Sequence, residues 1–331
     1  LTERNKGSWS LMMIAANGGW GRLLSWFILT TTVSLLATSF AGAVFYPADS
    51  VNIVAPLWWA GGAIALPLVA IMVRPHRVAA VALLVCHAFA GAILFSPLLP
   101  ARAVGPEATP VRMVTYNMYG FNSQGEQAAQ WIIGQKPDFV VLLEATRFNH
   151  EAIELIRRHL PYAYDCSAKG RCSTIIFSRT PAQDVWPHAR GDADNRKALS
   201  ALTARFVIGD RTIPITGVHL KHPWPLDDQA DQLEELGNAL ANFGQHGIMT
   251  GDFNSAPWTF ALRRLAANGD FRLASGPKGS WPAHFPAFLR LPLDQVYLGR
   301  CATRISVRHG PAFGSDHLPV VSDLALVSCQ S

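Results

Sequence analysis

Three long apolar segments near the N-terminus constrain the fold most strongly. They cover residues 23–45, 53–73 and 78–96, and none of them contains Asp, Glu, Lys or Arg. Each is close to the roughly 17–25 residues that a helix needs to cross a bilayer. A soluble helical domain is the alternative, but three nearly uncharged runs in succession disfavour it. We therefore predict a membrane anchor, residues 1–97, with three transmembrane helices.

Charged residues around these segments predict their orientation. Three Lys or Arg residues precede the first segment, and Arg74 and Arg77 lie between the second and the third. The loop 46–52 has no Lys or Arg and one acidic residue, Asp49. Because positively charged loops stay in the cytoplasm, the N-terminus and the 74–77 turn are expected there. The chain after about residue 100 is then expected outside the cytoplasm.

The rest of the chain has a different composition. A linker rich in Pro and Ala, 98–111, leads into residues 112–331, which suffice for one large domain. Residues 104–331 carry 22 Lys or Arg against 21 Asp or Glu, so they lack the positive charge typical of nucleic-acid-binding surfaces. Strand-like and helix-like stretches alternate, which predicts sheets covered by helices. We expect strands at 112–117, 138–144, 173–178, 199–207, 213–219, 247–250, 293–298, 303–308 and 319–326, and helices at 124–134, 150–159, 228–243 and 258–267.

The cysteines predict disulfides rather than a metal site. Cys166 and Cys172 enclose five residues, a spacing that suits a small loop closed by a disulfide. Zinc is the alternative, but the spacing is wrong for a zinc knuckle and no histidine pair accompanies it. A second disulfide is expected between Cys301 and Cys329. Cys86 lies in an apolar segment and is expected to be a passive packed residue.

One short stretch, 246–259, carries a possible catalytic turn. An apolar run ends abruptly in Gly251, Asp252, Phe253 and Asn254. Asp252 and Asn254 are two residues apart, so on an extended backbone they point to the same side. A carboxylate there can orient or deprotonate a water molecule, and a neutral amide can donate to a developing oxyanion. The alternative is an ordinary turn, because the same residues are common in turns.

The same pattern recurs at the ends of other apolar runs. The polar side chains at these ends are Asn117, Glu144, His219, Asp294, Asp316 and His317. Taken singly, each has a structural explanation, such as a turn cap, a solvated strand end or a core histidine. Together they supply oxygen ligands and two imidazoles without a thiolate, a set that favours Mg²⁺ or Mn²⁺ over Zn²⁺.

Seven short motifs, in this order, give the chain a specific resemblance. They are TYNMYGFN (115–122), PDFVVLLEA (137–145), FSRTP (177–181), GVHLKHP (217–223), GDFNSAPW (251–258), LDQVYLG (293–299) and GSDHLPV (314–320). From about residue 111 to 326 the chain resembles the endonuclease/exonuclease/phosphatase superfamily, and the membrane segments lie outside this resemblance. The whole layout is similar to that of membrane-anchored bacterial members, which implies an anchor in a bacterial inner membrane and a catalytic domain on its periplasmic side. The superfamily includes nucleases, inositol polyphosphate phosphatases and bacterial sphingomyelinases. The resemblance implies an α/β fold of four layers, α-β-β-α: two packed sheets with helices on both outer faces.

The resemblance also implies a metal site and a reaction. Glu144 is expected to be the main ligand of Mg²⁺, with Mn²⁺ as a substitute. Asn117 and Asp316 are expected to complete or support that site. The implied reaction is in-line hydrolysis of a phosphate ester, in which the metal neutralises charge on the phosphoryl oxygens.

The remaining motif residues take catalytic roles by the same resemblance. Asp252 is expected to position and activate the attacking water, and Asn254 to stabilise the transition state. His317, oriented by Asp294, is expected to contact the scissile phosphate. His219 is expected to bind the phosphate or to assist the leaving group.

Two departures from the family pattern leave the substrate open. Many relatives have His at the position of Gln295, and the polar loop 184–197 matches no subgroup signature. A catalytically silent module that binds a phosphorylated ligand is the main alternative to a phosphoesterase, and a membrane structural protein is a third hypothesis. The oligomeric state is not predicted.

Two features of the sequence bear on the substrate class. The segment 281–292 is apolar and aromatic, which fits core packing or a rim that touches lipid. A basic rim for nucleic acid would have to come from four residues in loops, Arg171, Arg190, Arg196 and Lys197. Lipid or small phosphate esters are therefore expected at least as strongly as nucleic acid.

Overall fold

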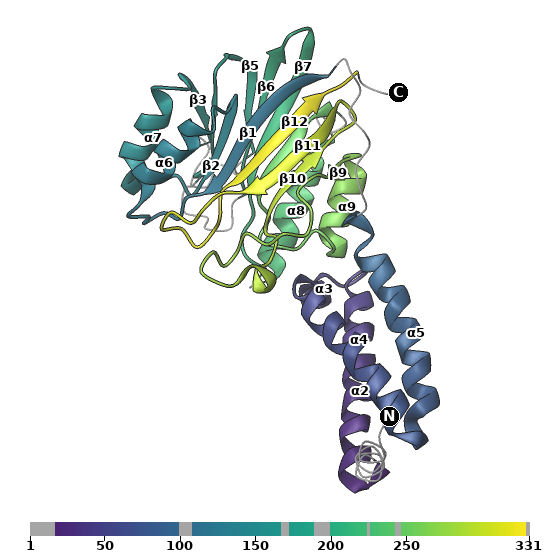
Figure 1. Cartoon of the computed structure of the whole chain (residues 1–331). Coiled ribbons are helices and arrows are strands. Elements are labelled where there is room, and N and C mark those ends of the chain that lie inside the picture. The colour runs from purple at the N-terminus through teal and green to yellow at the C-terminus, as the bar shows by residue number, and fades with distance from the viewer. Residues whose placement is uncertain are drawn as a thin grey trace. The chain divides into compact units, whose positions relative to one another are not determined.

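Figure 1 shows the computed structural model of the chain, which describes residues 17–98, 108–166, 172–188, 199–223, 226–241 and 246–328. The chain divides into two compact units, Leu1–Ser96 and Pro97–Ser331. Cys329 and the four residues of the expected basic rim, Arg171, Arg190, Arg196 and Lys197, lie outside the described residues.

In its described part, residues 17–96, the N-terminal unit is mainly helical, and three helices there are long and apolar enough to cross a membrane: Gly19–Ala41, Ala55–Met72 and Arg74–Leu94. They correspond to α2 (Gly19–Ala41), α4 (Ala55–Met72), and the 3-10 turn η1 (Arg74–His76) with α5 (Arg77–Leu94). α2 begins and ends four residues before the predicted segment 23–45. The expected loop 46–52 is instead the short helix α3 (Tyr46–Ile53), because Pro47 fits the first turn of a new helix.

The C-terminal unit contains two six-stranded sheets, each mixed in direction. The first sheet has the order β11-β12-β1-β2-β4-β3, with strands Ala302–His309, Val320–Leu326, Thr109–Asn117, Phe139–Leu143, Ile175–Ser178 and Tyr162–Asp165. The second has the order β5-β6-β7-β8-β10-β9, with strands Ala182–Pro187, Ser200–Ile208, Arg211–His219, Ile248–Asp252, Asp294–Leu298 and Arg272–Leu273.

Alternating residues of β1 explain why the sheets stack. Val111 and Met113 belong to the core between the sheets, together with apolar residues of β6, β7 and β10. Val114 and Tyr116 belong to a second core, which includes apolar residues of α6 (Gly125–Gly134) and α7 (His150–Arg157). Because successive side chains of a strand point to opposite faces, one strand contributes to both cores.

Two further helices, α8 (Leu226–Leu240) and α9 (Phe260–Asn268), lie beside the second sheet (Figure 1). With α6 and α7 on the outer face of the first sheet, the unit is a four-layer α-β-β-α sandwich. The predicted fold class is therefore confirmed.

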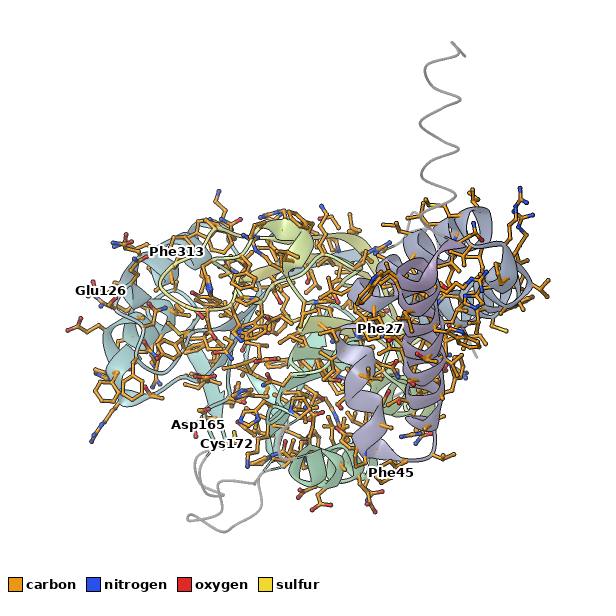
Figure 2. The ribbon with its side chains drawn as sticks, turned by 90° about the horizontal axis from the view of Figure 1, so that it is seen from below. Phe27, Phe45, Glu126, Asp165, Cys172 and Phe313 are labelled. Carbon is orange, nitrogen blue, oxygen red and sulfur yellow. A yellow bond between two sulfur atoms is a disulfide. The ribbon has the colours of Figure 1, made fainter. Side chains whose placement is uncertain are left out.

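The predicted disulfide between Cys166 and Cys172 is present, with Cα atoms 5.3 Å apart. Cys172 lies near Asp165 at the end of β3 (Figure 2). Cys301 is also disulfide-bonded, and its expected partner, Cys329, is outside the described residues. Cys86 is a free thiol, but it is exposed rather than packed inside the unit.

Three strands were not predicted: β3, β5 and β9. Each lies at the edge of its sheet, and β5 occupies the start of the segment that was expected to be a polar loop. These three edge strands are short and their residues are mostly exposed or half-exposed, so they carry little of the apolar pattern that reveals a central strand. The longer edge strand β11 was predicted.

Candidate active site

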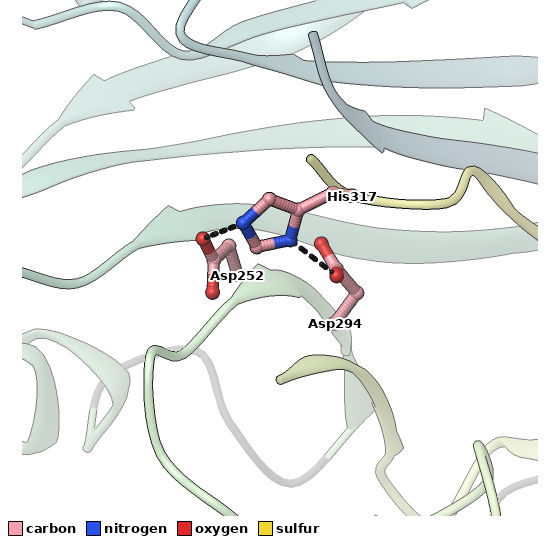
Figure 3. Close-up of side chains that lie close together, drawn as sticks. All are labelled: Asp252, Asp294 and His317. Carbon is pink, nitrogen blue, oxygen red and sulfur yellow. Dashed lines mark hydrogen bonds and ion pairs between the residues drawn. The ribbon is translucent and has the colours of Figure 1, made fainter. Parts of the chain in front are cut away.

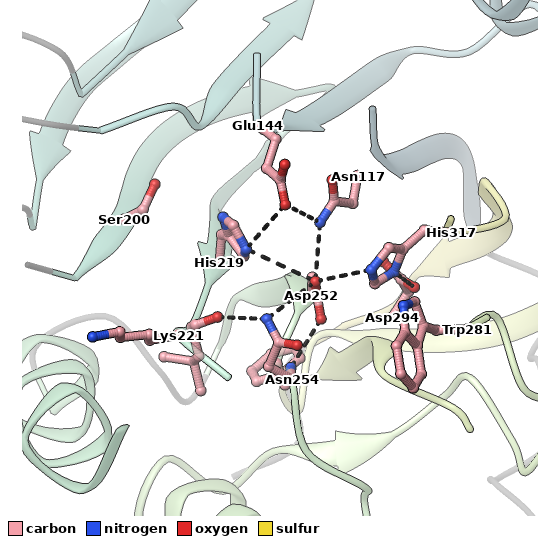
Figure 4. A network of polar contacts seen from close by, with 12 residues as sticks. Asn117, Glu144, Ser200, His219, Lys221, Asp252, Asn254, Trp281, Asp294 and His317 are labelled. Atoms are coloured by element: carbon pink, nitrogen blue, oxygen red, sulfur yellow. Dashed lines mark hydrogen bonds and ion pairs between the residues drawn. The ribbon is translucent and has the colours of Figure 1, made fainter. Parts of the chain in front are cut away.

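The polar side chains at the strand ends converge at one edge of the sandwich (Figure 4). β7 and β8 are parallel, and their last residues, His219 and Asp252, are register partners. β10 runs antiparallel to β8, which places Asp294 opposite Asp252. Between the sheets, the hydroxyl of Thr115 on β1 lies 2.7 Å from that of Thr250 on β8. This packing brings the end of β1 beside the end of β8.

Asp252 is the centre of this cluster and is fully buried. Its Oδ2 accepts hydrogen bonds from Nδ2 of Asn117 at 3.0 Å and from Nδ2 of Asn254 at 3.3 Å, and its Oδ1 accepts one from the Asn254 backbone N–H at 2.9 Å. Burial raises the pKa of Asp252, although the charges of His317 and His219 oppose this effect. A carboxylate with a raised pKa is a stronger base than one in water.

The glycine that precedes Asp252 is required by close packing. Gly251 has a φ of 153°, and a Cβ at this position would lie 1.8 Å from the carbonyl oxygen of Val218 on β7. Any side chain would push β8 away from β7. The Gly-Asp pair of the motif therefore belongs to a strand end rather than to an ordinary turn.

Asn117 and Glu144 form the second part of the site. Nδ2 of Asn117 lies 3.0 Å from Oε1 of Glu144 and 3.0 Å from Oδ2 of Asp252, so one amide bridges both carboxylates. Oε2 of Glu144 accepts a hydrogen bond from the Gly120 backbone N–H at 3.1 Å. Glu144 and Asn254 both have a left-handed backbone, with φ of 51° and 46°. Such a conformation is costly for residues other than glycine, and it is often found at functional sites.

His317 and Asp294 form a buried hydrogen-bonded pair (Figure 3). Nδ1 of His317 donates to Oδ2 of Asp294 at 2.7 Å, and its Nε2 lies 3.5 Å from Oδ2 of Asp252. Burial disfavours the charged imidazole, but the carboxylates of Asp294 and Asp252 outweigh it and raise the pKa of His317 to about 10. At neutral pH His317 is therefore a cation, with a proton on Nε2 that can be donated to an anion.

His219 and Asp316 differ in their contacts. Nε2 of His219 lies 3.7 Å from Oε1 of Glu144 and 3.8 Å from Oδ2 of Asp252, so His219 belongs to the cluster. Asp316 is exposed, and its Oδ2 accepts a hydrogen bond from the indole N–H of Trp281 at 3.0 Å. Among the described contacts, none joins the Asp316 carboxylate to Glu144 or Asn117.

Several supporting residues were not singled out from the sequence. The hydroxyl of Ser315 donates to the Asn117 carbonyl at 2.7 Å and accepts from the His317 N–H at 3.0 Å, so it links both halves of the site. From α8, Oε1 of Gln232 accepts from the Lys221 N–H, and Nε2 of Gln229 donates to the Lys221 carbonyl. Ser315 could have been identified because it lies inside the GSDH motif. The two glutamines of α8 lie in no motif, so the sequence gives no sign that they support the site.

Two groups of side chains could attract a cation. Glu144 and the Asn117 amide supply oxygen atoms of the kind that Mg²⁺ prefers. Nδ2 of Asn117 lies between the carboxylates of Glu144 and Asp252, a position where positive charge is favoured. Ligand atoms of Asp252, Asp294 and His317 also lie within 4.8 Å of one another. Because Nδ1 of His317 is already used in its hydrogen bond to Asp294, the group around Glu144 fits a metal ion better.

The fold and the site together identify the family: two stacked sheets carry buried carboxylates, amides and histidines at one edge. The family model described as "Endonuclease/Exonuclease/phosphatase family" matches residues 114–317. The chain belongs to this family, whose members are phosphoester hydrolases.

Solved structures support the fold. The endonuclease/exonuclease/phosphatase from Bacteroides vulgatus is 18% identical, with a TM-score of 0.54, and the match covers 66% of this chain and 99% of that chain. Beta toxin from Staphylococcus aureus, solved as a mutant with bound magnesium ions, is 14% identical over 66% of this chain and 100% of that chain, with a TM-score of 0.52. Sphingomyelinase C from Streptomyces griseocarneus is 17% identical over 65% and 99%, with a TM-score of 0.50. No curated protein matches the sequence.

Proposed function

We propose that this protein is a membrane-anchored, Mg²⁺-dependent phosphoesterase that hydrolyses a phosphate ester by in-line attack of water. The observation that carries the proposal is the contact of Asp252 with Asn117, Asn254 and His317 at one edge of the sheets. Family membership and the magnesium in the beta toxin structure support it.

The residues divide the work as follows. Asp252 orients the attacking water and takes its proton as the water oxygen bonds to phosphorus and the ester P–O bond breaks. Nδ2 of Asn254 donates to Asp252 and to the Leu220 carbonyl in the absence of substrate, and it would turn one of these hydrogens toward the negative charge that develops on the phosphoryl oxygens. Glu144 and Asn117 would hold the metal ion, which when bound supplies further positive charge to those oxygens. Asp316, held by Trp281, would support this site from a distance.

The two histidines face the phosphate from different sides of Asp252. Nε2 of His317 carries a proton and positive charge that stabilise the phosphoryl oxygens, and Asp294 keeps the ring in position through Nδ1. His219, beside both Glu144 and Asp252, binds the phosphate or donates a proton to the leaving oxygen.

A substrate panel tests this function. The full chain in lipid nanodiscs is incubated with DNA, RNA, sphingomyelin, phosphoinositides and bis-p-nitrophenyl phosphate. We expect turnover of at least one ester, loss of turnover with a chelator, and its return with Mg²⁺ or Mn²⁺. Binding of phosphorylated ligands without any turnover would instead favour the catalytically silent module.

The orientation of the anchor is a further part of the proposal. The three candidate spans and the positive charges of Arg74 and Arg77 support a cytoplasmic 74–77 turn and a periplasmic catalytic unit. A reporter enzyme that is active only in the periplasm should be active when fused after residue 110 and inactive when inserted at 74–77. The reverse pattern would contradict the orientation.

A further inference from the structure

An exposed cluster of aromatic side chains lies beside the candidate site. Tyr119, Phe121 and Phe148 are 43%, 67% and 60% exposed. The ring centroids of Phe121 and Phe148 are 4.8 Å apart, and the Arg147 guanidinium lies 5.4 Å from the centroid of Phe148. We call these four residues the aromatic rim. Contiguous exposed apolar side chains mark interaction surfaces more often than single, scattered ones do.

The aromatic rim is attached directly to the candidate site. It lies on the loops that follow β1 and β2, the strands that lead into Asn117 and Glu144. The Tyr119 N–H donates to Oδ1 of Asn117 at 3.0 Å, and the Gly120 N–H donates to Oε2 of Glu144. A molecule that contacts the rings therefore contacts a loop whose backbone bonds directly to Asn117 and Glu144.

The fold holds this loop in a strained conformation. Tyr119 has a φ of 58°, a left-handed conformation that is unfavourable for a bulky residue. Its carbonyl accepts a hydrogen bond from Nδ2 of Asn149, and the Gly120 carbonyl accepts one from Thr146. These hydrogen bonds fix the conformation of the loop, although the rings it carries are exposed. Packing in the core therefore does not explain why the loop is held in this conformation.

A second exposed apolar group lies in the loop that carries Trp281. Phe288 is 82% exposed, and Phe285 and Leu289 are 41% and 39% exposed, on and beside the 3-10 turn η6 (Ala287–Leu289). The loop that carries them is tied to the site, because Trp281 donates to the Asp316 carboxylate. This part of the segment 281–292 is thus a surface rather than packed core.

We propose that the aromatic rim docks on the surface of a lipid bilayer, so that the site takes a phosphate ester carried by a membrane lipid. The second half of this statement rests on the proposed phosphoesterase function. Aromatic rings and arginine suit the bilayer interface, where rings enter the headgroup layer and guanidinium groups meet lipid phosphates.

The rest of the chain favours lipid over nucleic acid. Three candidate spans precede the catalytic unit, and the ten residues from 99 to 108 reach at most roughly 40 Å even when fully extended. Stacking of single-stranded bases would use the same rings. However, residues 104–331 are nearly neutral, and binding of single strands relies on a positively charged groove.

The first test locates the rim directly. In the full chain, with Cys86→Ser, an environment-sensitive fluorophore is attached to Phe121→Cys, Phe148→Cys or, as a control, Ile305→Cys, which is 51% exposed on β11. In nanodiscs of phosphatidylethanolamine and phosphatidylglycerol, we expect spin-labelled lipid to quench positions 121 and 148, and aqueous iodide to quench position 305. Equal quenching at all three positions would overturn the proposal, as would protection of 121 and 148 by single-stranded DNA alone.

The second test concerns the substrate. The double variant Phe121→Ser/Phe148→Ser should lower the ratio of kcat/KM on bilayer-borne esters to kcat/KM on bis-p-nitrophenyl phosphate by about tenfold or more, because ring transfer into the interface is lost. Ile305→Ser should leave this ratio unchanged. A loss of equal size on both esters would overturn the lipid-substrate half. If the unmodified chain hydrolyses neither ester, the proposed phosphoesterase function is wrong. The quenching experiment then still tests whether the aromatic rim contacts lipid.

Discussion

Asp252→Asn should lower kcat by about 10²–10⁴-fold, the range that general-base catalysis contributes. The amide keeps the volume of the carboxylate but cannot accept a proton from water. It also retains an oxygen for the Asn254 N–H, which donates to Oδ1 at 2.9 Å. The measurement is turnover of the best ester in the panel at saturating Mg²⁺, together with a thermal melt.

The control for this variant is Asp210→Asn, a change of the same chemistry on a turn where the side chain is 91% exposed. It should leave both kcat and the melting temperature unchanged. The melting temperature of Asp252→Asn should stay close to that of the unmodified chain, because the amide keeps the volume of the carboxylate and the hydrogen bond from the Asn254 N–H. Full activity of Asp252→Asn in a metal-dependent assay would show that another group activates the water.

Glu144→Gln should raise the Mg²⁺ concentration needed for half-maximal activity by at least about 10–100-fold, the range seen even for supporting residues around bound metals. The variant keeps an oxygen for the Gly120 N–H but removes the negative charge that attracts the cation. The measurement is a Mg²⁺ titration of turnover, with isothermal calorimetry as a second readout that does not depend on activity.

The matched control is Glu151→Gln, because Glu151 is an exposed carboxylate on α7, a few residues further along the chain. Its titration should overlay that of the unmodified chain. An unchanged Mg²⁺ requirement in Glu144→Gln would remove Glu144 from the metal site and would direct attention to the group of Asp252, Asp294 and His317.

Much of the architecture follows from local sequence patterns. Apolar runs without charge predict the three candidate spans, and period-two or fully apolar runs predict the central strands, such as β2 and β8. Strand ends are visible because Gly251 and Asp252 interrupt an apolar run. These patterns depend only on residues that are neighbours along the chain, so they can be recognised without knowledge of the fold.

The edge strands and the exposed rings depended on the tertiary structure. β3, β5 and β9 are short edge strands whose residues are mostly exposed or half-exposed, so their sequences resemble loops. Phe121 and Phe148 lie in two different loops of the chain, and only the fold shows that their rings are exposed side by side.

The partners of the site residues were likewise decided by packing. The Asn117 amide reaches Asp252 across 135 residues of chain, and the Asn117 carbonyl reaches Ser315 across 198. Asp316 stands next to His317 in the sequence, yet its carboxylate bonds to Trp281, 35 residues away. Residue types and strand ends are local properties of the chain, whereas these contacts exist only because two sheets stack face to face and bring distant strand ends to one edge.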